Sequence, residues 1–183
     1  MKQGMNMNSV SRQRGAVLVI ALMMLLVMTI LGVTAMQMSR VEERMAGNTR
    51  DINLAFQGAE AGLRDAEGRL DAFIGVKPPT CATAPCNFWR KNTWTVSLRD
   101  QIPSWWITNG REYGVAATLE VAGVTRDPRT VIQEIDCVRD SPRVDAPQGR
   151  AFYAVTSNSS GATATTEAVL ETTYAKRVDN CLP

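Results

Sequence analysis

The sequence predicts an α+β fold, in which one long N-terminal α-helix packs on an antiparallel β-sheet of four or five strands. Residues 15–39 form an apolar run without charge, and apolar residues then recur at helical spacing as far as Phe73. Segments of strand composition follow a loop at residues 75–87. A chain of 183 residues predicts one domain of ordinary size or a small domain with an appendage, and it excludes a large multidomain enzyme.

The apolar run is long enough to cross a membrane as a helix. Of the 21 residues 16–36, 18 are apolar. Twenty-five helical residues span roughly 37 Å, against about 30 Å of bilayer hydrocarbon. We therefore expect residues 16–39 to span the membrane, with the N-terminus cytoplasmic because basic residues precede the run. These are Lys2, Arg12 and Arg14.

A cleaved secretory signal peptide is the alternative interpretation of this run. Val33, Thr34 and Ala35 have the small side chains that are typical of a cleavage site. The apolar stretch of a signal peptide is about 7 to 15 residues long. The greater length of this run favours a permanent anchor.

Residues 40–74 are expected to form the amphipathic half of the same helix. Apolar positions recur there at spacings of three and four, apart from one step of seven. No proline occurs between Ala16 and Lys77, so nothing forces a break before Pro78. Glycines at positions 32, 47, 58, 62 and 68 weaken such a helix unless close packing requires them. The apolar stripe consists of Val41, Met45, Ile52, Ala55, Ala59, Leu63, Ala66, Leu70 and Phe73.

Residues 75–183 are expected to form a disulfide-bearing, β-rich globular part that packs on residues 52–73. Val131, Ile135 and Cys137 are predicted to share one side of a strand, and residues 158–161 (Asn-Ser-Ser-Gly) are predicted to form a hairpin turn. The segments with strand character are 88–98, 113–121, 131–137, 151–157 and 163–174.

The composition excludes several kinds of function. The chain has no histidine, which removes Ser-His-Asp and Cys-His catalysis and every zinc site that contains histidine. From Arg40 onward, 17 basic and 18 acidic residues leave a net charge of −1, which lacks the basic surface of a nucleic-acid-binding protein. We therefore expect no catalytic residues, no metal or other cofactor and no nucleic-acid partner.

Four cysteines follow the apolar run, at positions 81, 86, 137 and 181. They permit three disulfide pairings. We favour Cys81 with Cys86 and Cys137 with Cys181, because each pair closes a loop around a turn-rich segment. Disulfides imply an oxidising compartment outside the cytoplasm.

Three weaker candidates have a plain structural explanation. Asp136, Asp140 and Asp145 are close in sequence but do not follow the spacing of a calcium loop, which favours solvated charge. Trp105 and Trp106 suggest either a contact patch or burial under a loop, and burial is the more common fate of tryptophan. Asn158 starts a glycosylation pattern that we interpret as turn chemistry.

The first half of the chain resembles the minor pilins of type IV pili. A short basic leader ends in Gly15, an apolar helix continues into an amphipathic one, and a strand-rich body with cysteines follows. More specifically, RGAVLVIALMMLLVMTILGVTAMQMSRVEERMAGN (residues 14–48) and AFQGAEAGLRDAE (residues 55–67) are similar to the N-terminal region of PilX-type minor pilins. The resemblance ends near Ile74 and implies a pilin fold.

The resemblance also assigns roles to residues of the helix. It implies a leader peptide at residues 1–15, which prepilin peptidase cuts between Gly15 and Ala16. Most pilins carry glutamate at the fifth mature position, where this chain has Ile20, and most have a helix-melting proline that is absent here. The missing carboxylate points to the filament tip, with drift among lipid-facing residues as the alternative. The assembly helix would use Ile20, Leu22, Leu25 and Leu26.

The resemblance implies a non-catalytic subunit that helps to initiate pilus assembly in the tip complex and so supports twitching motility and adhesion. Its partners would be other minor pilins, the major pilin, prepilin peptidase and the inner-membrane assembly platform. It would be stored in the bacterial inner membrane with its C-terminal part in the periplasm, and then enter the pilus. The alternatives are a tip pseudopilin of a type II secretion system, or a membrane-anchored periplasmic enzyme or binding protein.

We predict that the mature chain begins at Ala16 with a methylated amine, because the basic leader ends directly against the apolar run. Intact-mass analysis of membrane-extracted protein reads this start directly. Replacing Gly15 by a bulky residue should leave unprocessed precursor in the inner membrane. A chain that retains Met1, or that starts after Ala35, would contradict processing at Gly15.

Overall fold

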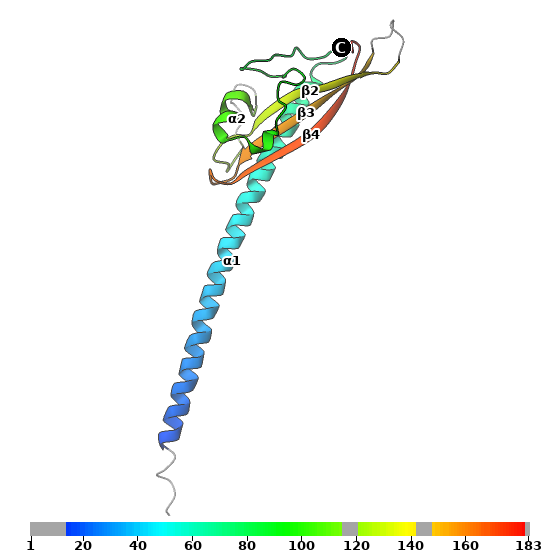
Figure 1. Cartoon of the computed structure of the whole chain (residues 1–183). Coiled ribbons are helices and arrows are strands. Elements are labelled where there is room, and N and C mark those ends of the chain that lie inside the picture. Colours follow the sequence, from blue (N-terminus) through cyan, green and yellow to red (C-terminus); the bar gives the residue numbers. More distant parts are fainter. Residues whose placement is uncertain (1–13, 115–120, 142–147, 182–183) are drawn as a thin grey trace, which may run out of the picture. The chain divides into compact units, whose positions relative to one another are not determined.

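The computed structural model describes residues 14–114, 121–141 and 148–181. It divides the chain into two units, Met1–Gly47 and Asn48–Pro183. Helix α1 (Arg14–Asp71) has 58 residues and belongs to both units (Figure 1). Its end at Asp71 agrees with the expectation of one helix that stops before Pro78.

The first unit contributes the apolar part of α1, whose described side chains are exposed. Every residue from Gly15 to Gly47 is exposed. A window of this helix has a mean hydropathy of 2.9 with none of it buried, so by length and composition α1 can cross a membrane. Thr29 and Thr34 donate their hydroxyls to carbonyls of the preceding turn, as an apolar surrounding requires.

The described residues of the second unit form a four-stranded antiparallel sheet in the order β1-β2-β3-β4. Figure 1 shows its three long strands, β2, β3 and β4, side by side. Together with α1 this confirms the predicted α+β class. A short 3₁₀-helix, Leu98–Asp100, and helix α2 (Pro103–Asn109) precede β1. The strands are β1 (Arg111–Glu112), β2 (Arg129–Arg139), β3 (Gly149–Ser160) and β4 (Glu167–Val178).

Close contact between α1 and β3 holds the helix on the sheet. Ala55, Ala59 and Ala66 are fully buried. A Cβ at Gly58 would collide with Ser159, and a Cβ at Gly62 would lie 3.0 Å from Pro128 Cβ and in contact with Ser157. Glycine and alanine on the helix, facing serine on the strand, therefore let the two backbones approach closely.

The apolar stripe of α1 enters the core later than expected. Ile52 is 50% exposed, so packing begins at Ala55 and not at Ile52. The main core joins Ala66 and Leu70 of α1 to Ile132 of β2 and Val155 of β3.

The expected hairpin turn at residues 158–161 is wrong. Asn158, Ser159 and Ser160 belong to β3 and are buried, and residues 161–166 connect β3 to β4. Small polar side chains favour turns locally, but here Ser159 fills the narrow space opposite Gly58 of α1, whereas Asn158 and Ser160 hydrogen-bond to Arg126. Because Asn158 is buried, its side chain is not accessible for glycosylation.

Two further strand expectations are also wrong. Residues 88–97 form a loop in which Trp89 makes isolated bridges to Cys81 and Gln133, and Leu98 begins the 3₁₀-helix. In β2 a register shift between Glu134 and Asp136 leaves Ile135 41% exposed, so Ile135 does not share a buried side with Val131. Of the strand expected at 113–121, residues 115–120 lie outside the described residues, and Tyr113 and Val121 are not in strands.

We predict that Gly62→Ala destabilises the fold, by about 1 to 3 kcal/mol, because the added methyl overpacks the contact with Ser157, Pro128 and Thr130. Gly68→Ala is the matched control, since nothing lies within 4 Å of its Cβ. It should stabilise α1 by about 0.5 to 1 kcal/mol through helix propensity. Urea unfolding of the full chain in detergent measures both, and equal effects of the two substitutions would contradict the close packing.

Candidate assembly interface

The candidate functional site is the apolar surface of α1, because most of the exposed large apolar side chains among the described residues lie between Val17 and Met45. Ile20, Leu22, Leu25 and Leu26 are 58%, 60%, 66% and 53% exposed. Such a continuous surface is unfavourable in water at about 25 cal/mol per Å². It therefore needs lipid or other apolar helices around it.

The expected processing residues lie where this surface begins. Gly15 and Ala16 are in the first turn of α1, both exposed, and Gly15 has open space around it. The rest of the expected leader, residues 1–13, lies outside the described residues. Exposure of these two residues is compatible with cleavage between them, which stays a prediction.

At the start of the second unit, Asp51 fixes the β3–β4 connection to α1. Its carboxylate accepts the Thr163 hydroxyl at 2.6 Å and the Thr163 N–H at 3.2 Å. These hydrogen bonds, with one from Thr166, lower the pKa of Asp51 below its ordinary value of 3.8. Gly161 lies against Asp51, where a Cβ would collide with its carboxylate.

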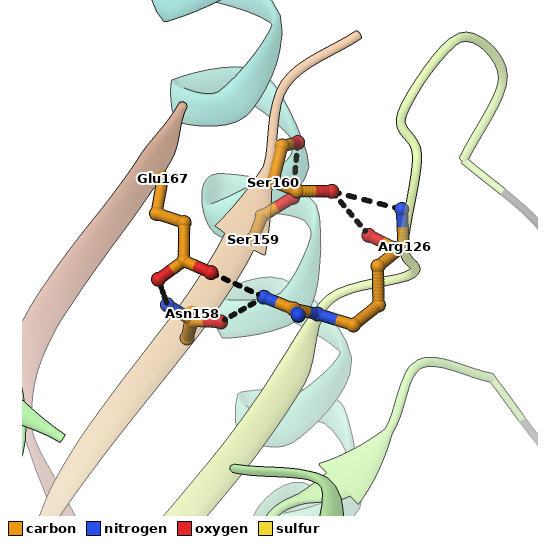
Figure 2. Close-up of polar contacts among 5 residues, drawn as sticks. All are labelled: Arg126, Asn158, Ser159, Ser160 and Glu167. Atoms are coloured by element: carbon orange, nitrogen blue, oxygen red, sulfur yellow. Dashed lines mark hydrogen bonds and ion pairs between the residues drawn. The ribbon is translucent and has the colours of Figure 1, made fainter. Parts of the chain in front are cut away.

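A second polar group ties the segment before β2 to the β3–β4 hairpin (Figure 2). Arg126 Nη2 donates to Glu167 Oε1 at 2.6 Å and to Asn158 Oδ1 at 3.4 Å. Ser160 Oγ accepts the Arg126 N–H at 2.8 Å and donates to the Arg126 carbonyl at 3.2 Å. All these groups bind one another, so the cluster is suited to holding a loop rather than to proton transfer or nucleophilic attack.

The structure joins Cys81 to Cys86 and Cys137 to Cys181, the pairs favoured from the turn-rich loops. Cys137 and Cys181 lie in the core between sheet and α1. Cys81 and Cys86 lie in a second apolar cluster with the tryptophans.

The second cluster covers the part of the sheet that carries Val131 and Val169, on the face opposite α1. Val131 faces this cluster, whereas its neighbour Ile132 faces the α1 core. Trp106 is fully buried, which confirms the expected burial, and Trp105 is half-buried. Trp89, Trp94, Trp105 and Trp106 form a row of edge-to-face contacts, with ring centroids 4.8 to 5.2 Å apart.

The acidic residues weighed as a calcium site are engaged with basic side chains. Lys91 Nζ lies 2.7 Å from Asp136 and lowers the pKa of that carboxyl. Asp140 lies 3.5 Å from Arg177. Asp145 lies outside the described residues. Among the residues that the structure describes, no group of three potential metal ligands comes together.

Several residues that position these elements were not predicted from sequence. Gly58 and Gly62 have the helical spacing that places them on one face of α1. Their partners, Ser159 and Ser157, are about 100 residues away in the sequence. Thr163 is similarly distant from Asp51. The serines at the end of β3 are the one local feature of the sequence that could have suggested its contact with the glycines of α1.

The fold and the uncovered helix define the class of protein: a subunit with an N-terminal helix suited to membrane insertion and a β-sheet domain stapled by disulfides. Residues 14–64 match the PilX N-terminal family model, and residues 57–176 match the model of the C-terminal part of the type IV pilus assembly protein PilX. The chain belongs to the PilX family and is a type IV pilus assembly protein. Comparisons with curated proteins and with solved structures give no match.

We predict that loss of the Cys137–Cys181 bridge destabilises the chain more than loss of the Cys81–Cys86 bridge. The bridges close segments of 44 and 5 residues, for which loop-closure entropy gives about 4 and about 2 kcal/mol. Paired Cys→Ala variants of the full chain, unfolded in urea, measure the difference. Equal losses, or no loss on reduction of the wild type, would contradict a structural role for the long-range bridge.

Proposed function

We propose that this chain is a minor pilin: a non-catalytic structural subunit that waits in the bacterial inner membrane and then enters the type IV pilus. The observation that carries the proposal is the uncovered apolar surface of α1 in a member of the PilX family. In this proposal the N-terminus is cytoplasmic and the disulfide-bearing part is periplasmic before assembly. In the membrane lipid would cover this apolar surface, and in the filament the helices of other subunits would cover it.

The mechanism we propose is an exchange of contacts around one helix. In the membrane, lipid covers Ile20, Leu22, Leu25 and Leu26. In the filament, helices of the major pilin and of other minor pilins cover them instead. Since lipid is as apolar as leucine, helix packing and not the hydrophobic effect drives this exchange. Prepilin peptidase would prepare the chain by cutting after Gly15, and the inner-membrane platform would supply the work of extraction.

We place the subunit at the tip because of Ile20. A shaft subunit carries a carboxylate there, which pairs with the amine of a neighbour, whereas a tip subunit needs no such pair. From this position it would help to initiate assembly, and so support twitching motility and adhesion. A tip pseudopilin of a type II secretion system also lacks the carboxylate, so Ile20 favours that second candidate equally, and the genes beside this one would separate the two.

We predict that cells lacking this chain make few or no pili, and that the wild-type chain restores them. Ile20→Glu should restore them no better, because an unpaired carboxylate in hydrocarbon costs roughly 2.5 to 3.5 kcal/mol. Ile20→Leu is the matched control and should behave as wild type. The measurement is the amount of this subunit, relative to the major pilin, in sheared pili.

The same sheared pili also test the position of the subunit at the tip. If Ile20→Glu increased incorporation and immunogold labelling spread along the shaft, the tip assignment would be wrong. If the deletion left pilus number unchanged, the role in initiating assembly would be wrong.

A further inference from the structure

The part of α1 that packs on the sheet meets β3 through two notches in the helix surface. Gly58 and Gly62 carry no side chain, and the hydroxyls of Ser159 and Ser157 occupy the positions where their Cβ atoms would lie. The glycines are four residues apart, about 6 Å along a helix, and the serines are two residues apart, about 6.8 Å along a strand. The two spacings agree to within about an ångström, so both serines are seated at the same time.

The notches allow one register of the helix on the strand. The row of α1 positions at four-residue spacing continues with Leu54 before the notches and Ala66 after them. A shift by one notch would place Ser159 against Leu54 in one direction and Ser157 against Ala66 in the other. The side chains on either side of the two glycines therefore block a slide of α1 along β3.

The rest of the buried helix face offers little resistance to such a slide. Its fully buried side chains next to the glycines are the methyl groups of Ala55, Ala59 and Ala66. The hydrophobic effect has no direction, so a shift that keeps these methyl groups covered costs little. Resistance to sliding therefore comes from the seated serines.

The Ser157 hydroxyl supports a steric role for these serines. Its oxygen is buried and has no hydrogen-bond partner among the residues that the structure describes. A buried hydroxyl without a partner is unfavourable. Alanine would avoid that cost, but it would remove the atom that fills the notch at Gly62.

Hydrogen bonds at both ends of the contact oppose the same movement. At the N-terminal end, Asp51 accepts the hydroxyl and the N–H of Thr163, which precedes β4. Towards the C-terminal end of α1, Lys176 of β4 donates to the Leu70 carbonyl. A slide of a few ångströms breaks these bonds together, because a hydrogen bond is lost a few tenths of an ångström beyond about 3.2 Å.

We propose that α1 and the sheet form an axial interlock, in which Ser157 and Ser159, seated at Gly62 and Gly58, pass a pull along the helix to the whole β-sheet domain. The hydrogen bonds at the two ends carry load together with the notches, since a slide moves all of them at once. The use of this interlock when the subunit is pulled from the membrane rests on the proposed function. The interlock itself is measured without pili, so its failure is separate from a failure of that function.

The test is single-molecule pulling on the full chain in a lipid nanodisc. Handles at the exposed Asn48 and Asn180 pull along α1, because they lie before the contact with the sheet and beyond the far end of β4. Handles at Asn48 and the exposed Ala164 pull α1 away from the sheet, because residue 164 follows the residue that binds Asp51. At equal load we expect the contact to last roughly tenfold longer, or more, in the axial geometry. Equal lifetimes in the two geometries would overturn the proposal.

Serine variants test whether the notches cause this difference. Ser157→Ala with Ser159→Ala should shorten the axial lifetime roughly tenfold and the transverse lifetime less than about threefold, because the emptied notches affect sliding alone. Ser160→Ala is the matched control, since this neighbouring serine hydrogen-bonds to Arg126 (Figure 2) and its loss should leave the ratio of the two lifetimes unchanged.

The ratio of the axial to the transverse lifetime decides the outcome. The single Ser157→Ala variant serves if the double variant melts early. A serine variant that keeps the wild-type ratio, or a Ser160→Ala control that lowers it equally, would overturn the proposal.

Discussion

The structure depends on one constraint: the apolar surface of residues 15–39 has to be kept out of water, and the described part of the chain does not cover it. The β-sheet domain has its own core, formed by residues from Ala55 onward. The first unit therefore adds little to the stability of the second. Its sequence is free to meet the demands of lipid and of neighbouring helices, which explains a run without charge, proline or buried contacts.

Within the second unit, the close approach of α1 to β3 sets the remaining geometry. Gly58 and Gly62 bring the helix onto the serines of β3, and this position aligns Asp51 with the β3–β4 connection. With one face of the sheet occupied by α1, the tryptophan cluster covers the other. The Cys137–Cys181 bridge then ties the C-terminal end to β2.

Sequence predicted best what depends on local periodicity and composition. The apolar run, the helical spacing up to Phe73 and the proline at 78 were sufficient to predict α1 and its end within a few residues. The antiparallel sheet followed from the strand character of residues 151–157 and 163–174. The family resemblance was carried by the helix and now extends over residues 57–176 as well.

Sequence failed where a distant partner overrides a local preference. Residues 158–160 were expected to form a turn, yet they lie in β3, where Ser159 faces Gly58 of α1 and Asn158 and Ser160 hydrogen-bond to Arg126. Ile135 was predicted to lie on a buried side of its strand, but the register shift between Glu134 and Asp136 leaves it exposed. Helix α2 was not among the expected elements, although proline at its first position suits a helix, and Trp106 packs it against the sheet.

The most direct test of the central claim is the location of the mature chain in cells with and without the major pilin. Fractions of sheared pili, inner membrane and soluble periplasm are compared by immunoblotting. If residues 16–39 always need an apolar surrounding, the chain occurs in membrane and pili when the major pilin is present, and in the membrane alone when it is absent. A stable, mature chain in the soluble periplasm would contradict that claim.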